Sequence, residues 1–304
     1  MLDTIRVKYP IIPEAEQLEY WTQKISVSPT GVSQKYIYNY KLDEALLKYT
    51  YIPTDYTGKP LLSLELSLPK LLFDNNYRMI SSIDGTIKIG NLLLRDIPHA
   101  PNLDLAEGIL IRMDMCYNHQ VGDKVDDYLK AMGHLDFPHR RTKVHRQEGV
   151  EFRAKHKTLK FYNKERESRF PEAAGILRQE LTLMHPKDIQ KLLGTKTSRL
   201  TDITKEFVKE HLENELTRLH LLGNSIHTRD TAPQELSAAY GELAGMYYFG
   251  YLMMKLNNSK KEIVSKTDTH PRSIDRKLRK IVDSGVPLTL TESKDPLPPL
   301  EINL

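Results

Sequence analysis

The sequence predicts an α+β fold, in which a sheet-rich first part is followed by a helical last third. Short segments with alternating apolar residues recur before residue 198, and apolar residues at helical spacing dominate after it. The 304 residues are 39% hydrophobic and 28% charged, which is the balance of a globular chain. We therefore expect two domains, residues 1–198 and residues 199–304. The first is expected to hold a curved antiparallel or mixed sheet with helices on one face.

The strands of the first domain are predicted from period-two alternation, as in LLSLELSL, where leucines alternate with polar residues. One helix is expected within this domain, over residues 121–132, with Asp126, Asp127 and Lys130 on its outer face. The predicted strands cover residues 34–41, 61–68, 86–94, 108–117, 150–154, 158–163 and 176–184.

The helices of the last third are predicted from apolar residues three and four positions apart. The final two of these helices, the second one basic, suggest a helix-turn-helix, and an ordinary pair of basic surface helices is the alternative. The Pro-rich tail, residues 291–304, is expected to be extended or loose. The predicted helices cover residues 202–222, 233–256, 259–266 and 271–283.

The charge is concentrated in two zones. Residues 140–169 carry a net charge of +7 and residues 255–280 carry +6, although the whole chain carries only +4. Two basic zones on an otherwise acidic chain suggest two surfaces that contact a polyanion, and solvated surface charge is the alternative. The single cysteine, Cys116, excludes an internal disulfide and a cysteine-rich zinc site. With neither an apolar span of about 20 residues nor a signal-like start, we expect a cytoplasmic protein without a membrane role.

Three predicted strands each carry one carboxylate among apolar residues: Glu65, Asp114 and Glu180. Strand centres disfavour carboxylates, and like charges on neighbouring strands repel each other. A divalent cation removes this repulsion because Mg²⁺ and Mn²⁺ take carboxylate oxygens as ligands. The three residues are therefore candidate metal ligands, and the alternative is that each faces water on an open sheet.

Tyr162 ends a predicted strand among the cations Lys157, Lys160, Lys164 and Arg166. A phenol has a pKa of about 10 and is a weak nucleophile at neutral pH. Nearby cations favour the phenolate and also bind a phosphodiester, so this setting suits a tyrosine that attacks DNA phosphorus. The alternative is an ordinary packing tyrosine, since the chain contains sixteen.

Four segments follow one another along the first two-thirds of the chain: LELSLPKLLFDNN (64–76), ILIRMDMCYNHQVGD (109–123), KTLKFYNKERE (157–167) and GILRQELTL (175–183). In this order they resemble the replication initiators of filamentous phages and related plasmids, the gene II/X group. The resemblance extends along roughly residues 1–195, and the R-x-D strand, the YNK tyrosine and the R-x-E strand are also similar to the Rep_trans plasmid initiators.

This resemblance implies rolling-circle initiation. Such proteins nick one strand of a supercoiled origin through a tyrosine, remain attached to the 5′ phosphate, and later rejoin the strand. The resemblance implies that Tyr162 is the nucleophile and that Asp114 and Glu180 are the Mg²⁺ or Mn²⁺ ligands. Glu65 is added as a third candidate ligand because of the strand pattern alone. Lys164 and Arg178 would hold the scissile phosphate. Lys70, Asn75 and Asn76 lie in a matching segment without an assigned role.

Many rolling-circle nucleases bind metal through two histidines separated by one residue. None of the eleven histidines here has that spacing, which favours the carboxylate interpretation. His119 and His156 are candidates for an additional ligand or a proton shuttle, and the alternative is that each is an ordinary histidine. The expected partners are origin DNA, as supercoiled duplex and single strand, a host helicase and a second copy of the chain. The alternatives are a DNA-binding regulator without chemistry and a mobilisation relaxase or transposon nickase. The residues expected to contact DNA are Arg140, Arg141, Lys143, Lys155, Lys157, Lys160, Arg272, Arg276 and Lys277.

Overall fold

The computed structural model describes residues 1–28, 31–55, 57–145 and 148–304. Residues 146–147, within the first basic zone, therefore lie outside the described residues. The chain divides into two compact units, and each is assembled from separate stretches of sequence. Unit 1 contains Met1–Tyr117, Glu180–Val208 and Leu304, and unit 2 contains Asn118–Gln179 and Lys209–Asn303. The domain division expected at residue 198 stays a prediction.

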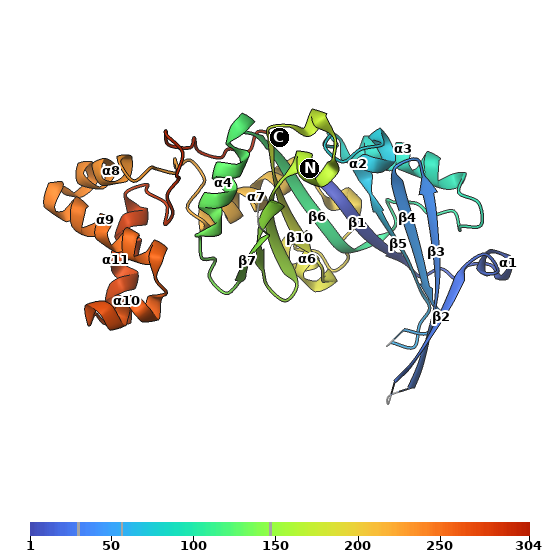
Figure 1. Ribbon diagram of the computed structural model, residues 1–304. Helices are drawn as coiled ribbons and strands as arrows, with labels where there is room; N and C mark the ends of the chain where they lie inside the picture. The colour runs from blue at the N-terminus through green and yellow to red at the C-terminus, as the bar shows by residue number, and fades with distance from the viewer. Residues whose placement is uncertain (29–30, 56, 146–147) are drawn as a thin grey trace. The chain divides into compact units, whose positions relative to one another are not determined.

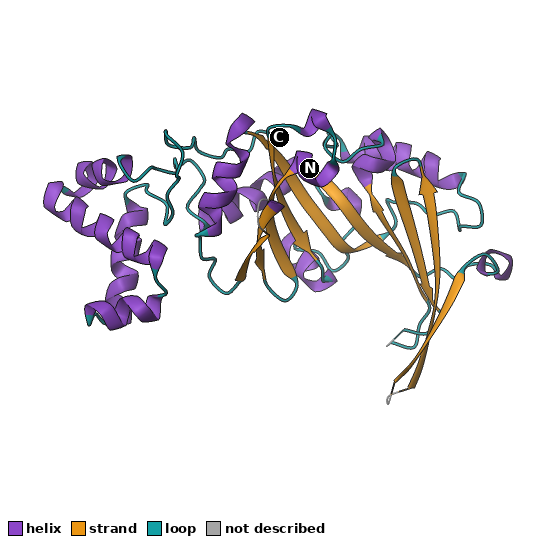
Figure 2. Cartoon of the chain, in the orientation of Figure 1, coloured by secondary structure: helices purple, strands orange, loops and turns teal. Residues whose placement is uncertain are grey.

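The predicted α+β class is confirmed, with a large antiparallel sheet and a helical C-terminal region (Figures 1 and 2). In unit 1 the strand order is β2-β3-β4-β5-β1-β6, and its ladders are antiparallel. One face of this sheet carries the core, because alternate residues such as Val7, Tyr49 and Leu64 are completely buried. The strands are β1 (Leu2–Tyr9), β2 (Thr22–Ser28), β3 (Gly31–Leu42), β4 (Ala45–Ile52), β5 (Leu61–Ser67) and β6 (Ile109–Gln120).

The helix α2 (Leu68–Phe73) packs on β1 and β5, and α3 (Ile83–Arg95) packs against α2. The strand predicted over residues 86–94 is wrong, because this segment lies within α3. The Ser82 side chain caps the helix by accepting a hydrogen bond from the Gly85 backbone, and Ile83, Ile87 and Leu94 share its buried face. The shorter helices are α1 (Ala15–Leu18) and α6 (Pro186–Leu193), and η4 (Leu200–Asp202) is a 3₁₀ turn.

In unit 2 the strand order is β10-β9-β8-β7, and the β7–β8 and β8–β9 ladders are antiparallel. These strands are β7 (Arg141–His145), β8 (Gly149–Arg153), β9 (Lys157–Asn163) and β10 (Ile176–Leu183). The predicted helix near residues 121–132 is confirmed as η1 (Gly122–Lys124) followed by α4 (Val125–Gly133), which packs on β7, β8 and β9. The short helix α5 (Lys164–Ser168) follows β9 directly, and η3 (Pro171–Ala173) precedes β10.

Five helices follow η4 in the described part of the chain (Figure 1), and all of them belong to unit 2 except the first four residues of α7: α7 (Lys205–Arg218), α8 (Thr231–Tyr240), α9 (Glu242–Asn257), α10 (Lys260–Thr267) and α11 (Pro271–Asp283). The single helix predicted over residues 233–256 is wrong, because Gly241 separates α8 from α9 with φ +82° and ψ 158°. Gly245 then lets the two helices meet, since a Cβ there would lie 2.5 Å from Ser237.

The Pro-rich tail is extended, as predicted, but it is docked rather than loose. Leu297 forms a bridge with Ile226, and Leu300 forms one with Leu222. Leu297 and Ile302 are almost completely buried, so apolar contact holds the tail in place. The Tyr128 hydroxyl donates a hydrogen bond to the Pro298 carbonyl. In the described part of the chain, no helix has the length and apolar character needed to span a membrane.

Candidate functional site

Glu65 lies on the sheet face opposite the core of unit 1, since its neighbours Leu64 and Leu66 are buried on the other face. Glu65 of β5 is paired in register with Lys48 of β4 on one side and with Arg6 of β1 on the other. The Arg6 Nε donates a 2.6 Å hydrogen bond to a Glu65 oxygen, and Arg112 Nη1 lies 3.1 Å from the other oxygen. Arginines therefore neutralise Glu65, and this carboxylate does not fit the role of a metal ligand.

Asp114 of β6 is 3% exposed and accepts two hydrogen bonds from Arg112, at 2.7 and 3.1 Å. Its pKa is raised to about 6, mainly by burial, and the nearby carboxylates of Glu180 and Asp3 raise it further against the opposing effect of Arg112. The repulsion between Asp114 and Glu180 is the kind that a divalent cation removes, so these two residues fit the expected metal. Within the described ranges, no three His, Cys, Asp or Glu side chains are grouped as a metal site.

Tyr162 lies on β9, directly opposite Gly149 of β8. A Cβ at position 149 would lie 2.6 Å from the Phe161 carbonyl oxygen and 2.9 Å from the Tyr162 Cβ, so only glycine fits beside this tyrosine. Neighbouring Phe161 points to the other face and is completely buried. Tyr162 therefore points away from the apolar core of the β7–β9 ladder.

Several predicted DNA-contact residues share that face with Tyr162. Glu151 of β8 is paired in register with Lys160 of β9 on one side and with Lys143 of β7 on the other. Arg153 of β8 is paired with Arg141 of β7. Arg141, Lys143 and Arg153 are exposed, while Glu151 is buried and paired with Arg153 at 2.8 Å. The face around Tyr162 consequently carries an excess of positive charge.

The two cations expected to hold the scissile phosphate are both completely buried. The Lys164 Nζ lies 5.6 Å from the centre of the Tyr162 ring and 2.6 Å from a Glu167 oxygen. Arg178 of β10 donates a 3.3 Å hydrogen bond to Asn118. Lys164 is thus the cation next to the candidate nucleophile, whereas Arg178 is anchored within the sheet of unit 2.

Two residues expected to contact DNA are instead engaged with a carboxylate that the sequence analysis did not single out. Glu215 of α7 is 2% exposed and pairs with Arg140 at 2.6 Å and with Lys157 at 2.6 Å. The Arg140 side chain is 4% exposed and lies over the Phe137 ring at 3.9 Å. The role of Arg140 in this structure is therefore internal, and Lys157 is only 29% exposed.

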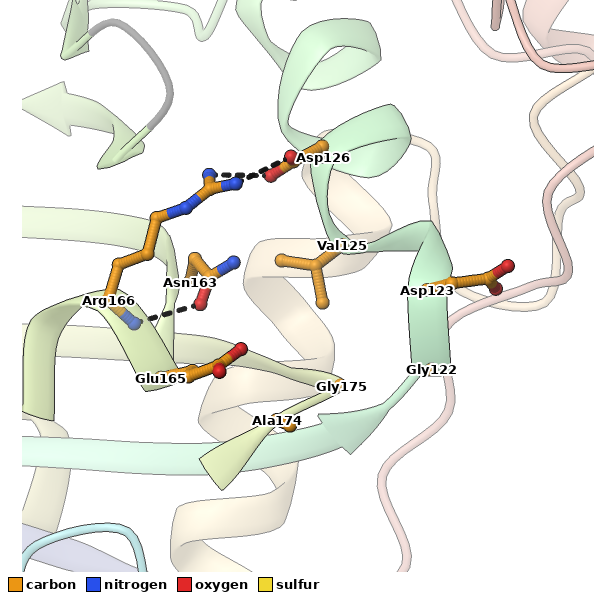
Figure 3. A pocket seen from close by; sticks show the side chains of 9 residues that line it. All are labelled: Gly122, Asp123, Val125, Asp126, Asn163, Glu165, Arg166, Ala174 and Gly175. Atoms are coloured by element: carbon orange, nitrogen blue, oxygen red, sulfur yellow. Dashed lines mark hydrogen bonds and ion pairs between the residues drawn. The ribbon is translucent and has the colours of Figure 1, made fainter. Parts of the chain in front are cut away.

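A pocket of about 470 Å³ adjoins the segment that follows Tyr162 (Figure 3). Arg166 crosses it and makes two 2.7 Å contacts with Asp126, and Asn163 accepts a hydrogen bond from the Arg166 backbone. Asp123 and Glu165 bring two further carboxylates to the lining. With three carboxylates and one guanidinium, this pocket carries a net negative charge and repels phosphate groups.

The remaining predicted residues lie outside these clusters. Arg272 and Arg276 are exposed on α11, Lys277 of the same helix contacts Tyr251, and Lys155 is exposed in the β8–β9 turn. Asn75 closes the loop after α2 by donating to the Phe73 carbonyl and accepting from the Arg78 backbone. Lys70 lies within α2, and Asn76 is buried beside Asn75. Arg112, Gly149 and Glu215 were missed because strand register and helix packing, rather than sequence spacing, define their neighbours.

Comparison with known proteins assigns no family. No protein-family model matches the chain, and no curated protein matches it. Among solved structures, the crystal structure of the di-domain ARO/CYC BexL from the BE-7585A biosynthetic pathway is similar over 65% of this chain and 76% of that one. The sequence identity is 14% and the TM-score is 0.20, a similarity too low to carry an argument about fold or function.

Proposed function

We propose that this protein is a rolling-circle replication initiator that nicks one strand of an origin through Tyr162 and later rejoins it. One observation carries the proposal: Tyr162 shares a sheet face with Arg141, Lys143 and Lys160, opposite a glycine that leaves room for it. A phosphodiester strand is attracted to such a face, because most protein–DNA contacts go to the phosphates.

The proposed step is a transesterification. The Tyr162 oxygen attacks phosphorus and forms a P–O bond, while the bond from phosphorus to the 3′ oxygen breaks. The phenol proton leaves to water and the 3′ oxygen takes up a proton, so no co-reactant is consumed. The 5′ phosphate stays on Tyr162, and attack by a 3′ hydroxyl reverses the step and rejoins the strand. Lys164, whose Nζ lies 5.6 Å from the centre of the Tyr162 ring, is the residue proposed to hold the scissile phosphate.

Asp114 and Glu180 are the residues that would hold Mg²⁺ or Mn²⁺. Such an ion polarises the P–O bonds and stabilises negative charge on the leaving oxygen. The support for this assignment is the repulsion between the two carboxylates, which the hydrogen bonds from Arg112 to Asp114 offset in part. The exposed residues Lys155, Arg272 and Arg276 are proposed to contact origin DNA. The assignment of Arg178 to the scissile phosphate stays a prediction. A curved sheet, a helix-turn-helix-like end formed by α10 and α11, and a cytoplasmic location in a bacterial host belong to the same proposal.

The test uses supercoiled DNA from the protein's own replicon, incubated with Mg²⁺ or Mn²⁺ and then with chelator. Nicked circles and an adduct that survives denaturant are scored for the wild type and for Tyr162→Phe. Tyr20→Phe is the matched control, because it removes a hydroxyl from a 59% exposed tyrosine of unit 1. Metal-dependent nicking that is lost only in Tyr162→Phe supports the proposal. Nicking that persists in this variant would show that a residue other than Tyr162 is the nucleophile.

A DNA-binding regulator without chemistry is the second candidate. The observation in its favour is that Arg6 and Arg112 already neutralise carboxylates on the face that was expected to need a metal. Binding to the origin without nicking, by a wild-type protein supplied with either metal, would select this candidate over the first.

A further inference from the structure

Four tyrosines of α8 and α9 gather on one side of the helical region in unit 2. The Tyr240 and Tyr248 ring centroids are 5.0 Å apart, and Tyr247 lies 5.7 Å from Tyr248 and 5.2 Å from Tyr251. All three pairs meet edge to face, which is a favourable geometry for aromatic rings. We call this group the tyrosine cluster. It is distinct from Tyr162 and has no role in the proposed nicking step.

Two lysines of α11 lie against the tyrosine cluster. The Lys277 Nζ lies 4.1 Å from the Tyr251 ring centre and 5.2 Å from the Tyr247 ring centre, and it donates a hydrogen bond to the Tyr251 hydroxyl. Lys280 lies 5.9 Å from the Tyr240 ring centre, and the Tyr240 hydroxyl donates a 2.7 Å hydrogen bond to the Lys280 carbonyl. The lysines therefore fix the tyrosine rings in place and add positive charge beside them.

The outer part of this surface is open. Tyr247 is 51% exposed, although its ring is held by Tyr251 and Lys277. Arg272, Arg276 and Lys280 follow one another at four-residue intervals along α11, and all three are exposed. A positioned aromatic ring is thus presented to solvent with Lys277 against it, and Lys280, which lies against Tyr240, connects the tyrosine cluster to the exposed basic row.

We propose that the tyrosine cluster and the basic row of α11 bind single-stranded DNA, with an unpaired base stacked on Tyr247. Rigid aromatic rings combined with cations are the two elements of sequence-tolerant single-strand binding, in which bases stack and the backbone is attracted electrostatically. Duplex DNA would use the cations but not Tyr247, because its bases are already stacked. This inference goes beyond the nicking function and holds whether or not Tyr162 cleaves DNA.

Binding is measured by the fluorescence anisotropy of a labelled thymidine oligonucleotide, without metal and in a Tyr162→Phe background, so that cleavage does not interfere. Tyr247→Ala is expected to weaken binding by about tenfold or more, the loss expected for one stacked base. Leu243→Ala is the matched control, because Leu243 is 89% exposed on the same helix and offers no ring to a base. Binding to a blunt duplex of the same length is expected to be unchanged by Tyr247→Ala.

A second variant protects the test against a folding defect. Tyr247→Trp keeps a stacking ring and is expected to keep the affinity, and its tryptophan fluorescence should be quenched by the oligonucleotide. The sequence contains one tryptophan, Trp21, which lies in unit 1. The protein without the Tyr247→Trp substitution therefore gives the background fluorescence change to subtract.

Unchanged affinity in Tyr247→Ala together with unquenched Tyr247→Trp overturns the inference. Equal weakening on single strand and duplex would also overturn it, because the surface would then bind backbone charge alone. If Tyr247→Ala and Leu243→Ala both lower the sedimenting mass without altering DNA affinity, this face binds a second copy of the chain instead.

Discussion

Protonation of His119 controls part of the acid stability of unit 2. His119 lies on β6, 4% exposed, with its Nε2 at 3.0 Å from the Gln179 side-chain oxygen. Gln179 in turn donates to the Leu212 carbonyl on α7, so its oxygen is directed at the imidazole. Burial lowers the pKa of His119 to about 4, although its hydrogen bonds to Gln179 and to the Glu301 backbone act in the opposite direction.

The sign and size of the effect follow from proton linkage. The pKa of His119 is about 4 in the folded state and 6.5 in the unfolded chain, so the unfolded chain binds the extra proton. The stabilising contribution is complete above pH 6.5 and is lost as the pH falls toward 4. At pH 5 the solution lies about 1.5 pH units below the pKa of His119 in the unfolded chain. Between pH 7.5 and pH 5 the free energy of unfolding should therefore fall by about 2 kcal/mol on account of His119.

The measurement is urea unfolding of the wild type and of His119→Gln at these two pH values. The variant is less stable at pH 7.5, but the gap between the two proteins should narrow by about 2 kcal/mol at pH 5. His211, His220 and His227 also have pKa values lowered mainly by burial, and they cancel in the comparison because both proteins retain them. An NMR titration that places the pKa of His119 at or above 6.5 would refute the reasoning, since the two acceptors would then outweigh burial.

Three further substitutions test the structure. Glu215→Gln should destabilise unit 2 by about 3–5 kcal/mol in urea unfolding, because it removes the charge partner that buried Arg140 shares with Lys157. Gly241→Ala should cost about 1–3 kcal/mol in the same assay, since its φ of +82° with ψ 158° is a region that only glycine adopts readily. Ser82→Ala should cost about 1 kcal/mol through the lost α3 cap, and an unchanged unfolding midpoint would contradict that cap.

The fold was predictable from sequence where one face of an element is apolar and the other polar. β5 shows this, because the buried Leu62, Leu64 and Leu66 alternate with half-buried neighbours. The strand prediction over α3 was wrong because Ile87 and Ile89 alternate with polar residues, as they would in a strand. The helix is indicated instead by the Ser82 cap and by the helical spacing of Ile83, Ile87 and Leu94. The sequence pattern predicted one long helix across Gly241 because a glycine can also lie inside a helix. The sequence alone does not determine the positive φ of this residue, which separates α8 from α9.

The candidate site was only partly predictable, since its residues are far apart in the sequence. The mid-strand position of Glu65 was visible in the pattern, but its partner Arg6 lies 59 residues away and depends on strand register. Glu215 was hidden for the same reason, because the packing of α7 brings it to Arg140. Counting charges identified the first basic zone, residues 140–169. It did not distinguish the exposed cations Arg141 and Lys143 from Arg140 and Lys157, which pair with the buried Glu215.

The docked tail bears on the order in which the molecule is assembled during synthesis. Leu297 and Leu300 bridge residues 226 and 222, and Pro298 accepts the hydrogen bond from Tyr128 on α4. These tail residues leave the ribosome after the helices and strands that the structure describes in unit 2. The apolar surface that they cover is exposed to water until then, so we expect unit 2 to reach its full stability only after residues 297–302 have left the ribosome and docked.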